Sequence, residues 1–473
     1  QDQAQAAAAA GYEIYQVHVR GVGTKSVVIN TAMIDAKAEA CELLGNFASH
    51  LPRAFVGYLK SSAEAVIPLM QYRMSPRVKI PAVQATPHFI KCAMLKDMKE
   101  GRQYFLQSLE HYLAAIKAED EPDHLTVLLN SLSDSIDHLV SPLESSHIAL
   151  IDQILVFTLS EAMKRRQEYG KLVSEGTIDD EEMAEIEEAV DNENEMIGMT
   201  VAVVKSMANN AKEAYLQSFH KNLLPIFSMF MPENASPFLQ NAGACCLCDI
   251  IEALPKCQIA QQYAARFLPL AMKNSMSESI DLRQSSVFGI GVCAQSLGSE
   301  GFASRSQDAM RILMSIINAA DSRSDDNSAV TENAISSVTK ILELMTHRHS
   351  GETHPQAFGM LGHWLDWLPL TQDYIEAKVV HAKLCEFLAD AKRSGAILGE
   401  GNRKLPKVFS VFARVYPDPN LCDEKTRGRM CHIAKALVDQ LGQAAAREIM
   451  SRLPEEERMV IVRMLQEALG GGF

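Results

Sequence analysis

Apolar residues recur at helical spacing along most of the chain, in segments that alternate between a first and a second helix. First helices are expected to begin near Phe55, Gly101, Ser146, Ala211, Gln258, Gly301, His354 and Asn402. Second helices are expected near Arg77, Pro122, Glu182, Pro237, Ser279, Asn327, Gln372 and Cys422. One such pair cannot bury both of its apolar faces alone. The pairs must therefore stack on one another and share a continuous core.

The first helices recur at intervals of about 45 residues, which lies within the range of about 40–47 that is typical of HEAT repeats. We therefore predict an all-α fold, a right-handed α-α superhelix (solenoid) of about eight or nine HEAT-type helix pairs. The segment 267–298 follows this plan, with Pro269 in the first helix and Asp281 and Arg283 at the turn into the second. A stack of this kind offers a long concave surface suited to macromolecules and no enclosed pocket.

Strand-forming patterns occur only near the start of the chain. Residues 12–20 and 26–30 flank a short loop that contains two glycines, which predicts a β-hairpin. The Ala-rich beginning of the sequence indicates that the chain is excised from something longer. We expect residues 1–33 to form an N-terminal extension with the hairpin, 34–170 to form HEAT repeats, 171–204 to form an acidic insertion within a repeat, and 205–473 to form HEAT repeats and a C-terminal cap.

The charge of the chain is concentrated in one segment. The 473 residues include 59 acidic and 45 basic residues, which gives a net charge of −14. Between Leu172 and Val204 there are eleven acids and no Lys or Arg, and the rest of the chain is nearly balanced. This distribution argues against a broad nucleic-acid-binding face, and it favours a partner that is itself basic.

The candidate partner-binding site is this acidic segment. Its ten candidate residues are Asp179, Asp180, Glu181, Glu182, Glu185, Glu187, Glu188, Asp191, Glu193 and Glu195. Clustered carboxylates would attract a Lys- or Arg-rich partner. The alternative is a solvated loop that serves solubility alone. Because Met183, Ile186 and Val190 are spaced as i, i+3 and i+7, part of the segment is expected to be an amphipathic helix docked on the stack.

A second set of candidates lies on the second helices, which we expect to line the concave face. These residues are Asp249, Glu252, Gln284, Glu332, Asn333, Asp373 and Glu376. The alternative for each is a solvated polar surface without a partner. Trp364 and Trp367 lie three residues apart on a first helix. Core packing is the favoured interpretation of this pair, and a pocket for Phe-Gly repeats is the alternative.

Several chemical motifs fail on their context. The glycines in 289–294 match a loose dinucleotide-binding pattern but lie within a predicted helix and follow no strand. Cys245 and Cys248 form a C-x-x-C pattern inside a helix without a second ligand pair, which favours buried thiols over a zinc or redox site. Ten irregularly spaced cysteines favour a reducing compartment. We therefore expect no catalysis, cofactor or metal, although His347, His349 and His354 could bind metal adventitiously from a loop.

Four blocks in the second half of the chain carry a family resemblance. They are residues 282–295 (LRQSSVFGIGVCAQ), 331–342 (TENAISSVTKIL), 363–370 (HWLDWLPL) and 405–413 (LPKVFSVFA). In their order, and together with the acidic segment and residues 34–48, they resemble the C-terminal portion of importin beta-3 type nuclear transport receptors of the karyopherin-β family.

The resemblance implies a monomeric HEAT-repeat import receptor that shuttles between cytoplasm and nucleus. Such a receptor binds cargo with basic nuclear localisation signals and passes the pore through Phe-Gly nucleoporins. It releases cargo to Ran-GTP, and it binds neither nucleic acid nor membrane directly. The alternative is a static HEAT scaffold, such as a phosphatase regulatory subunit, which would respond to neither Ran-GTP nor Phe-Gly peptides.

Overall fold

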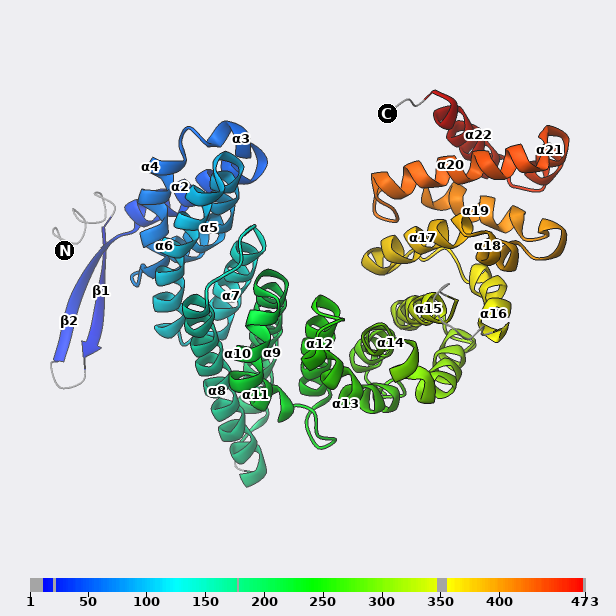
Figure 1. Cartoon of the computed structure of the whole chain (residues 1–473). Coiled ribbons are helices and arrows are strands. Elements are labelled where there is room, and N and C mark those ends of the chain that lie inside the picture. Colours follow the sequence, from blue (N-terminus) through cyan, green and yellow to red (C-terminus); the bar gives the residue numbers. More distant parts are fainter. Residues whose placement is uncertain (1–11, 20–22, 177, 347–354, 471–473) are drawn as a thin grey trace. The chain divides into compact units, whose positions relative to one another are not determined.

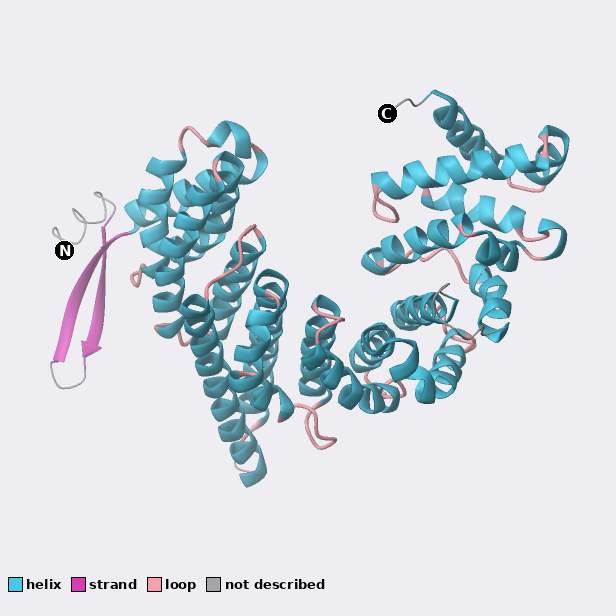
Figure 2. Cartoon of the chain, in the orientation of Figure 1, coloured by secondary structure: helices cyan, strands magenta, loops and turns pink. Residues whose placement is uncertain are grey.

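The computed structural model describes residues 12–19, 23–176, 178–346 and 355–470 of the chain. It divides into two compact units, Gln1–Pro232 and Glu233–Phe473, which we describe separately. Within the described residues both units are built from helices, and one two-stranded sheet belongs to the first (Figures 1 and 2). None of the described helices has the length and apolar character that a membrane span requires.

The predicted hairpin is present at the start of the first unit. Strand β1 (Tyr12–Val19) pairs antiparallel with β2 (Gly23–Asn30), so that Tyr12 lies opposite Asn30. Strand β2 leads directly into α2 (Thr31–His50), whose N-cap is Asn30. The Asn30 side chain accepts a hydrogen bond of 2.9 Å from the backbone N–H of Met33, which explains why the strand ends and the helix begins here.

The first unit is a stack of helix pairs. Its remaining helices are α3 (Pro52–Phe55), α4 (Leu59–Val66), η1 (Ile67–Gln71), α5 (Pro76–Lys96), α6 (Met98–Lys117), α7 (Pro122–Asp137), α8 (Ser145–Glu175), α9 (Asp180–Ala211), α10 (Glu213–Asn222) and α11 (Leu224–Ser228). The second helices α2, α5, α7 and α9 pack in that order, and α6, α8 and α10 form a parallel row of first helices. This is the arrangement that the sequence period predicts.

The second unit continues the same plan. Its helices are α12 (Pro237–Ala253), α13 (Gln258–Asn274), α14 (Ile280–Ile317), α15 (Asp325–Thr346), α16 (Pro355–Asp366), α17 (Tyr374–Ala389), α18 (Ala391–Leu398), η2 (Glu400–Asn402), α19 (Leu405–Val415), α20 (Glu424–Leu441), α21 (Gln443–Ser451) and α22 (Glu455–Gly470). Helices α12, α14, α15, α17 and α20 pack as successive neighbours. Helix α18 and turn η2 were not predicted.

Helix α14 contains two helices of the repeat plan. Gly298 interrupts it with φ +70°, a conformation that glycine adopts without a steric penalty. The part before Gly298 is the second helix predicted near Ser279, and the part after it is the first helix predicted near Gly301. Gly291 marks a close approach, because a Cβ there would lie 2.5 Å from the Ser337 hydroxyl on α15.

Candidate partner-binding surfaces

The acidic segment is helical, and it lengthens two helices instead of forming a loop between them. Residues 172–195, which we call the acidic finger, comprise the end of α8, a short turn and the first half of α9. Figure 1 shows the joined ends of α8 and α9 extending beyond the neighbouring helices of the first unit. Asp179 caps α9 by accepting bonds from the N–H groups of Glu181 (3.0 Å) and Glu182 (2.9 Å). The Glu182 carboxylate accepts the N–H of Asp179 at 3.1 Å, which completes a capping box.

One acid of the finger is buried at its base. The Glu193 carboxylate accepts hydrogen bonds from Arg165 Nε at 2.6 Å and Arg166 Nε at 3.1 Å. Arg166 also donates to the backbone oxygen of Val190 at 3.2 Å and to the Asn194 side chain, so that it ties α8 to α9 at three points. Burial lowers the pKa of Arg166 from its ordinary value, and the charge of Glu193 opposes that shift. The prediction that Glu193 faces a partner is wrong, because its side chain is fully buried in this clamp.

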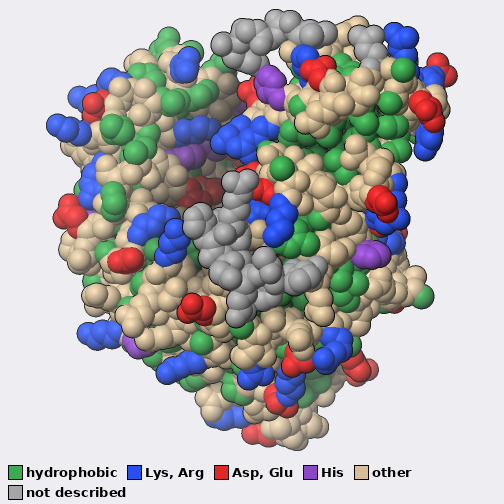
Figure 3. All heavy atoms as spheres, turned by 45° about the vertical axis from the view of Figure 1, so that its right-hand side comes forward, with side chains coloured by type: hydrophobic (Ala, Val, Ile, Leu, Met, Phe, Trp, Pro, Cys, Tyr) green, Lys and Arg blue, Asp and Glu red, His purple; other side chains and the backbone are tan. Residues whose placement is uncertain are grey.

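The other nine predicted acids are exposed to solvent. They are Asp179, Asp180, Glu181, Glu182, Glu185, Glu187, Glu188, Asp191 and Glu195. Met183, Ile186 and Val190 are half-buried, in keeping with the amphipathic helix that their spacing predicts. On the face of the molecule seen in Figure 3, acidic and basic side chains are interspersed. The finger therefore differs from that face in carrying charge of one sign on an ordered helix.

Three of the predicted second-helix residues are buried, and for them the prediction of a partner-facing position is wrong. Glu332, Asn333 and Glu376 expose 1%, 3% and 5% of their surface. The Glu332 carboxylate accepts the N–H groups of Thr371, Gln372 and Asp373 at 2.6–2.9 Å, at the start of α17. Buried polar groups are costly unless they are paired, and these residues pair with the next repeat.

The pairing between α15 and α17 continues along both helices. The Lys340 ammonium lies 2.8 Å from the Glu376 carboxylate, with both side chains almost fully buried. Glu376 also accepts a hydrogen bond from the Ser336 hydroxyl. Asn333 donates to Asp373 at 2.9 Å. We call these residues and Glu332 the buried ladder, because each bond joins positions about 40 residues, or one repeat period, apart.

The remaining second-helix candidates lie nearer the surface. Glu252 on α12 is exposed, and Asp249 on α12 and Gln284 on α14 are half-buried. Asp373 caps α17 by accepting the N–H groups of Ile375 and Glu376 at 3.1 and 3.0 Å. A partner-binding role for Asp249, Glu252 and Gln284 stays a prediction.

Trp364 is a core residue. Its side chain is fully buried, its indole N–H donates to the Thr339 hydroxyl at 2.7 Å, and its ring meets Phe387 edge-on at 5.4 Å. Trp367 is half-buried. This placement agrees with core packing for Trp364.

The buried thiols form no metal site within the described part of the chain. Burial raises the pKa of Cys248 well above its ordinary value, which disfavours the thiolate form. No cluster of three or more His, Cys, Asp or Glu that could hold a metal is found in the described ranges. The three predicted histidines in 347–354 lie outside those ranges.

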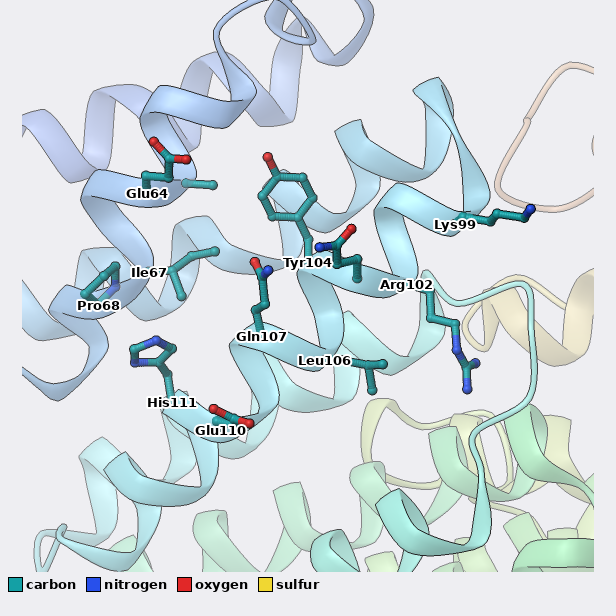
Figure 4. Close-up of a pocket in the computed structure, with 12 residues that line it drawn as sticks. Glu64, Ile67, Pro68, Lys99, Arg102, Tyr104, Leu106, Gln107, Glu110 and His111 are labelled. Atoms are coloured by element: carbon teal, nitrogen blue, oxygen red, sulfur yellow. The ribbon is translucent and has the colours of Figure 1, made fainter.

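A groove between two first helices was not predicted from the sequence. It encloses about 560 Å³ between α4 with turn η1 on one side and α6 on the other. Figure 4 shows Tyr104, Gln107 and His111 of α6 facing Glu64, Ile67 and Pro68 across it. The groove is lined by Ala63, Glu64, Ile67, Pro68, Lys99, Arg102, Gln103, Tyr104, Leu106, Gln107, Glu110 and His111. We call it the outer groove.

One wall of the outer groove is fixed by contacts to the next repeat. Arg102 donates to the backbone oxygen of Pro142 at 2.9 Å and to the Glu144 carboxylate at 3.1 Å. His111 shares a hydrogen bond of 3.0 Å with Gln71. An apolar floor with a polar rim suits a small apolar side chain on an otherwise polar segment. No local sequence signal marks it, because its two walls, α4 with η1 and α6, come from separate helix pairs.

Residues 124–233 match the family model described as Importin repeat 6. The chain is 26% identical to the probable importin-5 homolog of Dictyostelium discoideum over 76% of this chain and 34% of that protein. It is 24% identical to importin subunit beta-3 of Saccharomyces cerevisiae over 69% of this chain and 29% of that protein. The chain thus spans about a third of the length of these relatives.

Solved structures share the fold. Kap121p bound to RanGTP superimposes with a TM-score of 0.73 at 18% identity, covering 98% of this chain and 40% of Kap121p. The likeness extends over the helix stacks of both units. Together with the repeat model and the two relatives, it makes the chain similar to karyopherin-β proteins of the importin-5 type.

Proposed function

We propose that this chain is part of a nuclear import receptor, which binds cargo with basic localisation signals and releases it when Ran-GTP binds. The observation that carries the proposal is the acidic finger, an ordered helical surface on which nine exposed carboxylates lie at and beyond the start of α9, in a chain similar to karyopherin-β proteins. The receptor would shuttle between cytoplasm and nucleus. Its work is binding and conformational change, without catalysis.

The acidic finger is suited to a Lys- or Arg-rich partner. Its carboxylates lie on one ordered helix, held at the base by Arg165 and Arg166, so little conformational entropy is lost when a partner binds. Exposed charges are screened beyond about 8 Å at physiological ionic strength. Binding at the finger should therefore weaken steeply as salt is raised.

The outer groove is suited to a Phe-Gly nucleoporin. The Phe ring would lie on Ile67 and Pro68, and the polar residues at the rim would contact the backbone that follows it. Kap121p, whose fold the chain shares, has been solved bound to Nup53p. A single aromatic side chain in a groove of this size binds weakly, which is useful for a receptor that must cross the pore quickly.

Release by Ran-GTP requires that cargo and Ran-GTP favour different arrangements of the repeats. A stack in which each repeat contacts only its neighbours can change by small adjustments at each junction. Kap121p has been solved bound to RanGTP and, separately, to Pho4p. By analogy, we infer that Ran-GTP lowers the affinity of the intact receptor for cargo.

The first test is a titration of a fluorescent Lys-rich signal peptide with this chain at several salt concentrations. The matched variants lack residues 179–195 or carry Gln and Asn in place of its exposed acids. Salt-sensitive binding that both variants lose would support the finger as the basic-cargo site. Binding that is unchanged in both variants would refute it.

A static scaffold is the second candidate, because helix stacks of this kind serve either role. Binding measurements on the full-length receptor distinguish a scaffold from an import receptor. A scaffold would keep basic cargo at saturating Ran-GTP and would not bind Phe-Gly peptides, whereas an import receptor would lose the cargo and bind the peptides.

A further inference from the structure

A groove in the second unit lies between α20 and α22, which pack against each other (Figure 1). It encloses about 620 Å³. We call it the basic groove, because it is lined by four basic residues of α20, which are Lys425, Arg427, Arg429 and His432. Between Glu424 and Asp439 the sequence of α20 holds four Lys or Arg residues and no acid. This run has the opposite charge to the acidic finger.

Two of the cations in the basic groove have no carboxylate partner. Arg429 lies 3.4 Å from Glu386 on α17. Lys425 and Arg427 form no ion pair with any residue that the structure describes. Lys425 is exposed, and Arg427 is half-buried in the lining. The positive charge of these two side chains is therefore available to an anion.

The two acids in the lining leave the groove with a positive charge. Glu467 accepts hydrogen bonds from the Tyr416 hydroxyl and, at 3.1 Å, from Arg463 Nε on its own helix. Glu424 is the first residue of α20, where a carboxylate is attracted to the positive end of the helix dipole. Three Lys or Arg residues face these two Glu residues, and the charge of Arg463 beside Glu467 adds to the positive side.

Arg427 and Lys425 are placed as recognition residues more than as stabilising ones. The guanidinium of Arg427 lies over the ring of Tyr416, 4.8 Å from its centre. Stacking fixes the plane of a guanidinium and leaves its N–H groups at the edge, where their fork matches a carboxylate. Lys425 lies in the first turn of α20, where a positive charge is unfavourable for the helix. Helix stability therefore does not explain Lys425.

The basic groove also has an apolar floor. Cys431 is almost fully buried and Ala468 is half-buried. A partner that fits both surfaces combines carboxylates with small apolar side chains. A nucleic acid fits less well, because a phosphate backbone needs cations along its whole length, and the chain has a net charge of −14.

We propose that the basic groove binds an acidic segment of a partner protein that also carries apolar side chains. One carboxylate would lie at the edge of the Arg427 guanidinium and another at the Lys425 ammonium, with an apolar side chain over Cys431 and Ala468. The inference goes beyond the proposed function, since it concerns a partner of the opposite charge to basic cargo and a site in the second unit.

The test is fluorescence anisotropy of the full chain with a labelled twelve-residue peptide of alternating Asp and Leu. We expect saturable binding that is lost when Asn replaces every Asp of the peptide. R427Q and K425Q should each raise the dissociation constant by about two- to fivefold, the range of an exposed or partly exposed ion pair. R447Q, at an exposed arginine on α21 outside the lining, is the matched control and should change nothing.

Glu467 supplies a variant of opposite sign. E467Q removes a negative charge from the lining but still accepts the Tyr416 hydroxyl, so it should lower the dissociation constant of the acidic peptide. A purely structural role of Arg427 beside Tyr416 and Glu467 would make E467Q neutral or weaken binding. K425Q does not touch the stack on Tyr416, so it keeps the test valid if R427Q folds poorly.

The outcomes separate this inference from the proposed function. The acidic peptide should still bind the chain that lacks residues 179–195, and the Lys-rich peptide should still bind R427Q, so either proposal can fail alone. Equal binding of the Asp and Asn peptides, or equal weakening by R447Q and R427Q, would overturn the basic groove. A single-stranded oligonucleotide that binds more tightly than the acidic peptide, and that R427Q weakens, would overturn the assignment to a protein partner.

Discussion

The acidic finger and the buried ladder both depend on carboxylates, yet they use them in opposite ways. The finger places Glu187 and Glu188 in solvent on a helix that extends past its neighbours. The ladder places Glu332 and Glu376 inside the stack. The bonding partners of Glu332 lie one repeat later in the chain, and those of Glu376 lie one repeat earlier. Acids that follow one another without bases remain available to a partner. Acids that stand among the buried residues of α15 and α17 hold successive repeats together.

The largest expected effect comes from breaking the ladder at its ion pair. E376A leaves the Lys340 ammonium buried without its carboxylate, which should cost about 3–5 kcal/mol of unfolding free energy. The double variant K340M/E376L should recover most of that loss, because a buried pair can be replaced by apolar groups of similar size. Urea unfolding followed by circular dichroism measures both. Equal stability of E376A and the wild type would contradict a structural role for the ladder.

Acid should weaken the same region through His381. This buried ring accepts the N–H of Leu370 at 3.2 Å and donates to the oxygen of Leu421 at 2.9 Å, so the neutral form fits the site. Burial lowers the pKa of His381 from 6.5 to about 4. The unfolded chain therefore binds the proton first, and stability that is fully present above pH 6.5 is lost as the pH falls towards 4. The full loss is about 3 kcal/mol.

The variant H381N isolates this contribution. It should be less stable than the wild type at pH 7, and it should lose less stability between pH 6.5 and 4. Thermal unfolding across this pH range gives the comparison. Parallel pH profiles for the two proteins would show that His381 does not titrate with folding.

The position of the repeats could be predicted from the sequence, because the signals that set it are local. Ser75 and Pro76 begin α5, and Ser279 begins α14, each within a few residues of the expected start. The ladder could not be predicted in this way, since its bonds join residues one repeat apart. The composition of α15 gave no signal at Glu332, because residues 330–342 are all buried although polar residues such as Asn333 and Lys340 stand among them. The sequence also does not distinguish Glu193 from its exposed neighbours in the acidic segment.

A substitution of Glu193 tests the comparison between buried and exposed carboxylates within one helix, α9. E193Q leaves Arg165 and Arg166 without their shared carboxylate, which should cost about 1–3 kcal/mol and loosen the base of the finger. Hydrogen exchange of the amides in residues 180–195 should become faster in E193Q while α5 and α7 stay protected. Unchanged protection in E193Q would contradict a clamping role for the two arginines.

The smallest effect on stability is expected from the exposed acids of the same helix. E187Q/E188Q removes two negative charges, as many as E376A and E193Q remove together. It breaks no contact with a buried partner, and it reduces the repulsion between like charges along α9. The unfolding midpoint should stay where it is, or rise slightly, whereas the affinity for a Lys-rich peptide should fall several-fold at low salt and much less at high salt. A destabilised E187Q/E188Q would mean that the finger is tied into the stack as the ladder is. Unchanged stability together with weaker and less salt-sensitive binding of the Lys-rich peptide would show that carboxylates serve packing in the buried ladder and recognition in the acidic finger.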